Sequence, residues 1–377
     1  FYNFTVTKAS GSVIVSNDLV VNGNFTTSSN TSVFNNNNRN IQLFGNFNNA
    51  NGNSTFTNTG SIMGVGGLYF AGTNAQTYNE GSSQLDLNLV NITKGANAVT
   101  LNTNMHMKAT TGELLLFNGN FITGTYYIEV ANTAVASVSG GSTGSYVNGN
   151  LWRSVLPAGG SYDLPVGSPT WYERVNINLL GANTYAQLRA RYDNWPSGPN
   201  TLGLTECSAT YNWPTEDHGY WTINQTGGNT GNYNATLYCF GATNTAGVGG
   251  WTIQKASSVA GPWTLSGTCD MTSTAAIVKR NNMSGFSVLA AAQSVLPLPI
   301  EILSFTGTAE GINNHVFWGT SSEINNDHFV LERSVDAIHY EEVTTVAGAG
   351  NSNTILNYDV LDIRTADVTY YLSLIHI

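Results

Sequence analysis

Charged side chains are scarce in this sequence. Asp, Glu, Lys and Arg together make up 10% of its 377 residues, whereas an ordinary soluble domain carries roughly 25%. With only 13 Lys and Arg residues, the chain has no basic stripe for a nucleic-acid backbone. The same shortage argues against coiled coils and helical bundles, which are rich in Ala, Glu, Lys, Leu and Arg. Long apolar runs are missing too, so we expect no membrane-spanning helix; the best candidate, 286–303, is broken by Gln293, Pro297, Pro299 and Glu301.

Asparagine supplies the polarity that charge does not. The chain has 48 Asn, of which 25 lie in the first 120 residues. Hydrophobic residues still make up 41%, so the chain can bury a core and is not expected to be disordered. At this length we expect two or three domains.

Charge divides the chain into blocks. Residues 1–145 carry five acids and four bases, residues 146–298 seven of each, and residues 299–377 eleven acids and two bases. Almost all of the net charge of −10 therefore lies in the last block, which predicts a domain boundary near residue 298. We expect residues 295–300 to be the linker, because Pro297 and Pro299 favour an extended spacer.

Residues 1–143 repeat themselves. A Gly-Asn-Phe triplet at 23–25 recurs at 45–47, and Gly-Leu-Tyr follows at 67–69, a spacing of 22 residues. A second match, offset by 86 residues or close to four such periods, aligns the pattern beginning at Val6 with the one beginning at Ile92. Apolar residues alternate within each unit, so the units are built from strands. We predict a β-helix-like region of roughly six coils with stacked Asn amide ladders; the alternative is a β-sandwich in which the triplets are coincidental.

Residues 144–294 change to short strands separated by Gly and Pro turns, without a helical stretch, which predicts a two-sheet β-sandwich. Seven of the eight Trp lie between residues 152 and 263. A carbohydrate-binding protein can use such rings as stacking platforms, and the candidates for contact with a carbohydrate are Trp213, Trp221 and Trp251. The alternative is that these rings fill the core, which is the commoner role of Trp at alternating strand positions.

The three cysteines, Cys207, Cys239 and Cys269, all lie in the middle block and fit no Cys/His metal spacing. One interpretation is a disulfide among them with one thiol left over, which would indicate an oxidising compartment. The other is three buried, small apolar side chains. The pairing stays open, because three pairings are possible.

Three acids of the first block, Asp18, Asp86 and Glu129, fall at nearly the same phase of the 22-residue period. They would lie two or three coils apart, roughly 10 and 15 Å, which is too far to share a calcium ion. We therefore interpret them as isolated, solvated acids.

No group of residues predicts catalysis, a metal ion or a cofactor. The dense polar cluster at 216–218, Glu-Asp-His, is either an acid/base site or, since it follows a Trp-Pro pair, a turn. Hydrolase, zinc-protease and phosphate-loop motifs are absent from the sequence. Four histidines are scattered singly without metal spacing: His106, His315, His328 and His339. We expect no enzyme within this chain.

Residues 301–371 alternate apolar residues with solvent-facing acids in a series of strands, and Trp318 is placed for a sandwich core. This pattern predicts an incomplete fibronectin type III-like domain. The block reads Leu-Pro-Ile-Glu-Ile-Leu-Ser-Phe at 298–305, Thr-Ser-Ser-Glu-Ile-Asn-Asn-Asp-His-Phe at 320–329, Glu-Arg-Ser at 332–334 and Gly-Ala-Gly-Asn-Ser at 348–352.

In order and spacing, these segments resemble the module that precedes the C-terminal sorting domain in large surface and secreted proteins of the type IX secretion system. The stretches 160–167, 219–223 and 284–287 resemble the sandwich that often lies upstream in such proteins. Residues 1–143 are similar to their β-helical, adhesin-like repeats. The resemblance implies export by type IX secretion, with attachment to the outer membrane through a sorting domain beyond this sequence.

We expect the sequence to be a fragment. Residue 1 is Phe, so upstream sequence is expected. The last six residues, 372–377, read Leu-Ser-Leu-Ile-His-Ile, which is the in-frame translation of a common sequencing adapter. We interpret them as an adapter-derived artefact; the alternative is a natural strand end.

The sequence thus predicts an all-β chain in which a β-helix (solenoid) is followed by a β-sandwich and a partial fibronectin type III-like sandwich. The expected function is that of a non-catalytic stalk or adhesive region in a large secreted or cell-surface protein, with monomeric modules. The expected partners are glycans or other cell-surface polymers, and no nucleic acid. Two alternatives are the accessory region of a secreted carbohydrate-active enzyme and a carbohydrate-binding module in the middle sandwich.

Overall fold

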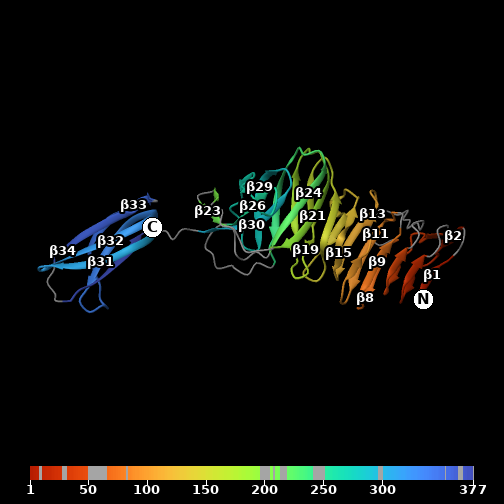
Figure 1. Cartoon of the computed structure of the whole chain (residues 1–377), viewed down its shortest axis with the longest axis horizontal. Helices are drawn as coiled ribbons and strands as arrows, with labels where there is room; N and C mark the ends of the chain where they lie inside the picture. The colour runs from red at the N-terminus through yellow and green to blue at the C-terminus, as the bar shows by residue number, and fades with distance from the viewer. Residues whose placement is uncertain are drawn as a thin grey trace. The chain divides into compact units, whose positions relative to one another are not determined.

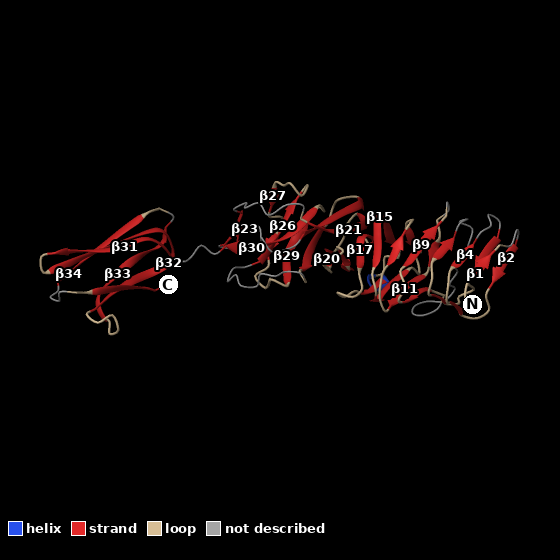
Figure 2. Cartoon of the chain, turned by 60° about the horizontal axis from the view of Figure 1, so that its bottom comes forward, coloured by secondary structure: helices blue, strands red, loops and turns tan. Residues whose placement is uncertain are grey.

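The computed structural model describes residues 1–7, 11–27, 32–49, 66–81, 84–195, 204–206, 209–212, 219–240, 251–295, 300–352, 354–363 and 368–376. The fold is all-β, with 64% of residues in strands and 1% in helix (Figures 1 and 2). The chain divides into two compact units, Phe1–Ser294 and Val295–Ile377. Within the described residues there is no helix with the length and apolar character needed to span a membrane.

The first unit begins with a β-solenoid of about six turns, in which neighbouring strands are parallel (Figure 1). Each turn contributes short strands to successive faces, and strands of one face pair from turn to turn. One face consists of β3 (Leu19–Val21), β6 (Ile41–Leu43), β8 (Leu68–Gly72), β11 (Leu89–Lys94), β14 (Glu113–Asn118) and β16 (Val138–Gly140). The second consists of β1 (Phe4–Val6), β4 (Phe25–Thr27), β7 (Phe47–Asn49), β9 (Gln76–Glu80), β12 (Val99–Leu101) and the first part of β15 (Phe121–Val130). The remaining strands are β2 (Gly11–Ile14), β5 (Ser32–Asn35), β10 (Asp86–Leu87), β13 (Met105–Met107) and the second part of β15.

The solenoid core is a set of in-register rows of inward side chains. Phe4, Phe25, Phe47 and Tyr78 stack face to face from turn to turn, with ring centroids 5.6, 5.3 and 5.2 Å apart and interplanar angles of 14°, 3° and 6°. The spacing follows the strand separation of about 4.8 Å, so each ring covers the next. The predicted β-solenoid is confirmed, and the alternative of a sandwich in this region is wrong.

The repeat pattern was interpreted incorrectly in two respects. Phe25 and Phe47 are register partners 22 residues apart, but the next ring in their row is Tyr78, 31 residues further along. The triplet at 67–69 instead belongs to β8 on another face, where Leu68 pairs with Ile41. The 86-residue offset likewise aligns β1 of one face with β11 of another. Every face shows the same alternation of apolar residues, so a sequence match can pair strands that belong to different faces.

The predicted Asn ladders are present and have a definite role. The backbone N–H of Asn24 donates to Oδ1 of Asn3, that of Asn46 to Oδ1 of Asn24, and that of Thr77 to Oδ1 of Asn46, at 2.8–2.9 Å. A direct amide–amide bond of 3.0 Å joins Asn79 to Asn48. These side chains satisfy backbone donors next to the strands, which explains why the solenoid is rich in Asn.

The second part of the first unit changes from parallel to antiparallel pairing at β17 (Val147–Ser154). This strand pairs in parallel with β15 and β19 (Val166–Gly167), and antiparallel with β21 (Tyr185–Asn194). The same sheet continues through β22 (Leu204–Glu206), β23 (Ala209–Asn212), β24 (Gly219–Gly227), β26 (Trp251–Ala256), β27 (Trp263–Thr264) and β30 (Val288–Val295). A second sheet contains β18 (Gly160–Leu164), β20 (Val175–Leu180), β25 (Asn232–Tyr238), β28 (Thr268–Cys269) and β29 (Ile277–Ser284).

One cluster of buried apolar side chains extends from Val6 to Ala291, so the solenoid core is continuous with that of the following sheets. Arg153 lies beside this junction and is fully buried. Its guanidinium donates to the carbonyls of Asp163 and Ala134 at 2.8 and 3.1 Å, which ties β17 to β18 and to the segment before the 3₁₀ turn η1 (Val135–Ser137). Burial lowers the pKa of Arg153 to about 10, so the side chain remains charged at neutral pH and its hydrogen bonds are charge-assisted.

The second unit consists of β31 (Ile300–Glu310), β32 (Asn313–Ser334), β33 (Glu341–Ser352), β34 (Leu356–Ile363) and β35 (Tyr370–His376), and β32 pairs antiparallel with all four others. Its core is built around Trp318, whose ring stacks on Tyr358 at 5.5 Å and packs against Phe329. The adapter origin predicted for residues 372–377 stays a prediction; residues 370–376 form β35.

A buried carboxylate ties the strands of this unit together. Glu323 is fully buried and accepts four hydrogen bonds, from Thr320 Oγ1 (2.8 Å), Asn326 Nδ2 (2.8 Å), the Ala349 amide (2.9 Å) and Tyr358 OH (2.6 Å). Burial alone would raise the pKa of Glu323, but these hydrogen bonds outweigh it and lower the pKa. Three members of this cluster, Thr320, Glu323 and Asn326, therefore come from one short segment of β32.

Glu323→Gln is expected to destabilise the second unit by at least about 2 kcal/mol, because an amide cannot accept hydrogen bonds at both of its terminal atoms. Hydrogen exchange of peptides from 341–363 measures this change in the full chain. The control is Glu342→Gln, which replaces an exposed acid of the neighbouring strand β33. Since the folded pKa is lowered, the stabilisation by Glu323 is present above its unfolded pKa and disappears as pH falls through the folded value. Equal protection in both variants would contradict this role.

Candidate functional site

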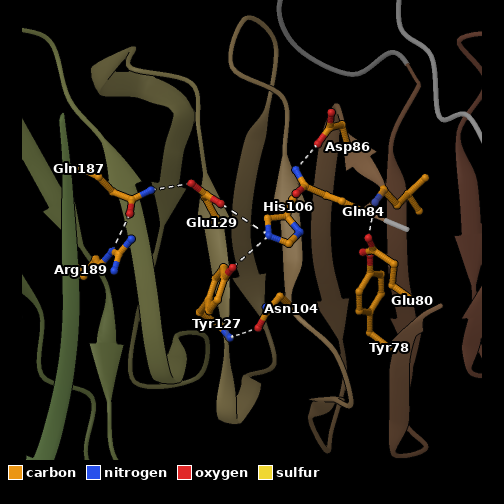
Figure 3. A network of polar contacts seen from close by, with 11 residues as sticks. Tyr78, Glu80, Gln84, Asp86, Asn104, His106, Tyr127, Glu129, Gln187 and Arg189 are labelled. Carbon is orange, nitrogen blue, oxygen red and sulfur yellow. Dashed lines mark hydrogen bonds and ion pairs between the residues drawn. The ribbon is translucent and has the colours of Figure 1, made fainter. Parts of the chain in front are cut away.

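A row of outward-facing polar side chains crosses the last turns of the solenoid. Asp86 on β10 is the register partner of His106 on β13, and His106 is the partner of Glu129 on β15. The same register continues to Trp152 on β17 and then to Arg189 on β21. Their neighbours along each strand point inward and form the core rows Met105–Ile128–Leu151 and Leu87–Met107–Val130. We call the outward set Asp86, His106, Glu129, Trp152 and Arg189 the polar row. Figure 3 shows four of its members, Asp86, His106, Glu129 and Arg189.

His106 is the centre of the polar row and is only 8% exposed. Its Nε2 lies 3.6 Å from Glu129 Oε2 and 3.3 Å from the hydroxyl of Tyr127. Burial lowers the pKa of His106, although Glu129 and Asp86 act in the opposite direction. The imidazole is therefore neutral at neutral pH. Its Nε2 donates a hydrogen bond to the Tyr127 hydroxyl or accepts one from it, depending on the tautomer.

Gln187 links Glu129 to the arginine end of the row. Gln187 Nε2 donates to Glu129 Oε1 at 2.6 Å, and Arg189 Nε donates to Gln187 Oε1 at 2.8 Å (Figure 3). The Arg189 guanidinium also lies 3.8 Å from the centre of the Trp152 ring. Tyr127 stacks on the same ring at 3.4 Å with an interplanar angle of 10°. Since β17 lies between β15 and β21, Tyr127 and Arg189 cover opposite faces of Trp152.

A cavity of about 300 Å³ opens beside His106, at the solenoid end of the row; Glu80, Asn102, Asn104 and Tyr126 also line it. Glu80 is 4% exposed and accepts hydrogen bonds from Tyr78 OH at 2.7 Å and from the Leu85 amide. Burial raises the pKa of Glu80 to about 7, since it outweighs these hydrogen bonds, and the nearby charge of Asp86 adds to the rise. Both carboxyl oxygens are thus occupied, one by Tyr78 of the same strand and the other by the chain just before β10.

A second, larger cavity of about 590 Å³ lies at the other end of the row, over β17, β21 and β24. Its described lining comprises Asn150, Trp152, Arg189, Ala190, Arg191, Thr222, Asn224 and Gln225. Two of these side chains are cationic and none is acidic. The arrangement suits the recognition of a polar, anionic ligand.

The acids identified in the sequence fall into two groups. Asp86 and Glu129 do share a face and lie two turns apart, one on each side of His106, whereas Asp18 precedes β3 on another face and accepts from the Asn40 amide at 2.9 Å. The interpretation of all three as isolated acids was wrong for Glu129, which contacts both His106 and Gln187.

His106 was likewise interpreted as a scattered single residue. The spacing of residues 86, 106, 129 and 152 is close to the 22-residue period, and this spacing could have revealed the polar row.

Two of the three tryptophans chosen as carbohydrate contacts, Trp221 and Trp251, do not present their rings at the surface. Trp221 is fully buried and its Nε1 donates to the Glu173 carbonyl at 2.9 Å, while Trp251 is 5% exposed. Neither ring can stack on a sugar, so the core interpretation is correct for both. Trp213 lies outside the described residues, as do residues 216–218. The sequence-based choice did not include Trp152, the tryptophan that lines the larger cavity.

Cys269 is disulfide-bonded, whereas Cys239 is a thiol buried in the core. Cys207 lies outside the described residues. Among the residues that the structure describes, no group of three or more His, Cys, Asp or Glu side chains is arranged to hold a metal ion. His315, His328 and His339 each contact acids of the second unit near the surface.

No protein-family model, curated protein or solved structure matches this chain. The interpretation of the polar row and its two cavities therefore rests on their own geometry.

Glu80 should make the solenoid less stable as pH rises from about 4.5 to about 7, because its carboxyl stays protonated in the fold after the unfolded chain has released the proton. The loss is at most on the order of 3 kcal/mol. Hydrogen exchange of peptides covering 76–90, corrected for intrinsic rates, measures it. Glu80→Gln should remove the pH dependence, since its amide oxygen accepts from Leu85 and its NH₂ donates to Tyr78, whereas Asp18→Asn should retain it. A wild-type profile that is flat, or that rises with pH, would contradict the assignment.

Proposed function

We propose that this chain is a non-catalytic stalk and adhesive region of a large secreted or cell-surface protein. The observation that carries the proposal is the polar row itself, which is held in register by the core rows beneath it and extends across five strands. A solenoid whose turns are stacked in this way makes a stiff support, because each turn is fixed by its neighbours on both sides. Such a support can present a polar strip to an extended polymer.

Two acids, Glu129 of the polar row and Glu80 beside it, support a binding role over a catalytic one. Glu80 has both oxygens engaged within the fold, and Glu129 is held by Gln187 and lies beside His106. These contacts fix the positions of strands and side chains, whereas a general acid must be within reach of a substrate proton. We extend the proposal to the partners, which are glycans or other cell-surface polymers.

Two finer assignments belong to the same proposal. The sheets after β17 form a β-sandwich, supported by the common apolar core that their inward residues share. The second unit is a fibronectin type III-like domain, supported by its antiparallel strands and its Trp318 core. Export by type IX secretion rests on the resemblance of segments 298–305, 320–329, 332–334 and 348–352.

The adhesive and non-catalytic parts are tested together with the full chain and a panel of neutral and acidic polysaccharides. The chain should co-sediment with at least one insoluble polymer and release no reducing ends from any of them. Reducing ends that the His106→Ala variant no longer releases would replace the proposal with an enzyme. If the chain sediments with none of the polymers, the adhesive role is refuted.

The export route is tested by sequencing the complete gene. We expect a C-terminal sorting domain of the type IX class downstream of the module that includes residues 298–352. A natural C-terminus without that domain would refute the assignment to type IX secretion and leave the binding role untouched.

A further inference from the structure

We infer that the cavity over β17, β21 and β24 binds an acidic saccharide, through a carboxylate or sulfate group held by Arg189 and Arg191. This inference rests on the proposed adhesive function and names the class of glycan that the polar row would recognise. The two arginines are two residues apart on β21, so their side chains leave the same face of the sheet about 7 Å apart. Leu188, Ala190 and Tyr192, on the opposite face, are buried.

Both guanidinium groups are held in place and keep hydrogen-bond donors available. Arg189 uses Nε to bind Gln187 and packs on Trp152, while Arg191 uses Nε to bind Asp193 Oδ1 at 2.7 Å. Within the described part of the chain, the Nη1 and Nη2 atoms of both arginines make no hydrogen bond. These four donor nitrogens carry two N–H groups each, and they match the several acceptor oxygens of a carboxylate or sulfate.

The neighbouring side chains favour a sugar as the carrier of that anionic group. Asn150, Thr222 and Asn224 line the same cavity and offer amide and hydroxyl groups, which pair with sugar hydroxyls. A volume of about 590 Å³ is within the range of small-ligand sites.

The aromatic ring in the cavity argues against a neutral sugar or a nucleobase. Both faces of Trp152 are covered, one by Tyr127 and the other by Arg189. It therefore offers no free platform for stacking, the main contact for such ligands. The ring instead positions the Arg189 guanidinium, which leaves charge as the dominant attraction.

Asp193 is the acid that limits the positive charge of the cavity. It pairs with Arg191, whose side chain is 44% exposed. Glu129 is the next acid along the row, but its hydrogen bond goes to Gln187 and not to an arginine. Neutralising Asp193 should therefore strengthen the binding of an anion.

The test is calorimetric titration of the full chain with a galacturonate tetrasaccharide, a κ-carrageenan tetrasaccharide that carries sulfate but no carboxylate, neutral maltotetraose, and oligothymidylate as a non-saccharide polyanion. At least one of the acidic ligands should bind and maltotetraose should not, and the responding ligand distinguishes the carboxylate from the sulfate. The affinity should fall as NaCl is raised from about 0.05 M to about 0.3 M. Equal binding of maltotetraose, binding of neither acidic ligand, or tighter binding of oligothymidylate would overturn the inference.

Matched variants locate the site. Arg191→Gln should weaken binding roughly tenfold or more, since it removes charge-assisted hydrogen bonds to the anion. The variant with both Arg189→Gln and Arg191→Gln should lose binding, and Asp193→Asn should gain affinity. Arg39→Gln removes an exposed arginine of the first solenoid turns and should change nothing. Because Arg189 packs on Trp152, the single Arg191 variant with unchanged thermal unfolding is the decisive one.

The outcomes separate this inference from the proposed function. If the double variant still sediments with a polysaccharide as well as the wild type does, the cavity is not the binding site and the adhesive function stands. If the double variant loses both oligosaccharide binding and sedimentation, the result supports the inference and the proposed adhesive function together.

Discussion

The register between successive turns is the constraint on which the first unit depends. An inward side chain is buried only if the turns on either side place an apolar group directly above and below it, as Phe25, Phe47 and Tyr78 do. The turns may differ in length, but the strands within them cannot shift by one residue without moving core side chains to the surface. The outward positions inherit the same register, and this is why Asp86, His106 and Glu129 form one row although the chain returns to that face only after 20 and then 23 residues.

The junction at β17 extends this row beyond the solenoid. β17 continues the parallel stack on one side and begins antiparallel pairing on the other, so its outward Trp152 has Tyr127 from the last turns on one face and Arg189 from β21 on the other. Beyond the junction, β17, β21 and β24 bring strands of eight to ten residues to the face, whereas β10 and β13 have two and three residues. A long strand can present two arginines side by side, and Arg189 and Arg191 use that geometry. The buried Arg153 secures the same junction from within, through backbone carbonyls on neighbouring segments.

Period-two alternation, Asn-rich turns and the lack of helical signals were sufficient to predict the solenoid and its amide ladders. They were not sufficient to assign strands to faces. The triplet at 67–69 looked like a third copy because all faces share one alternation, yet the 31-residue step from Phe47 to Tyr78 moved it to another face. Asp18 was placed with Asp86 and Glu129 for the same reason. Trp221 and Trp251 were candidate contacts because exposure cannot be read from residue type, and both proved to be core residues.

What the sequence by itself determined is local: which residues alternate, where turns occur, and that amides rather than charges satisfy the backbone between strands. The partners of each side chain were decided by the tertiary structure. His106 acquired Glu129 and Tyr127, and Glu323 acquired donors from three strands. The physical reason is that these contacts join residues brought together by pairing between strands, and pairing depends on how many residues each intervening turn takes up. The number of residues varies from turn to turn. It is therefore set by the packing of the inward side chains and not by the 22-residue sequence period.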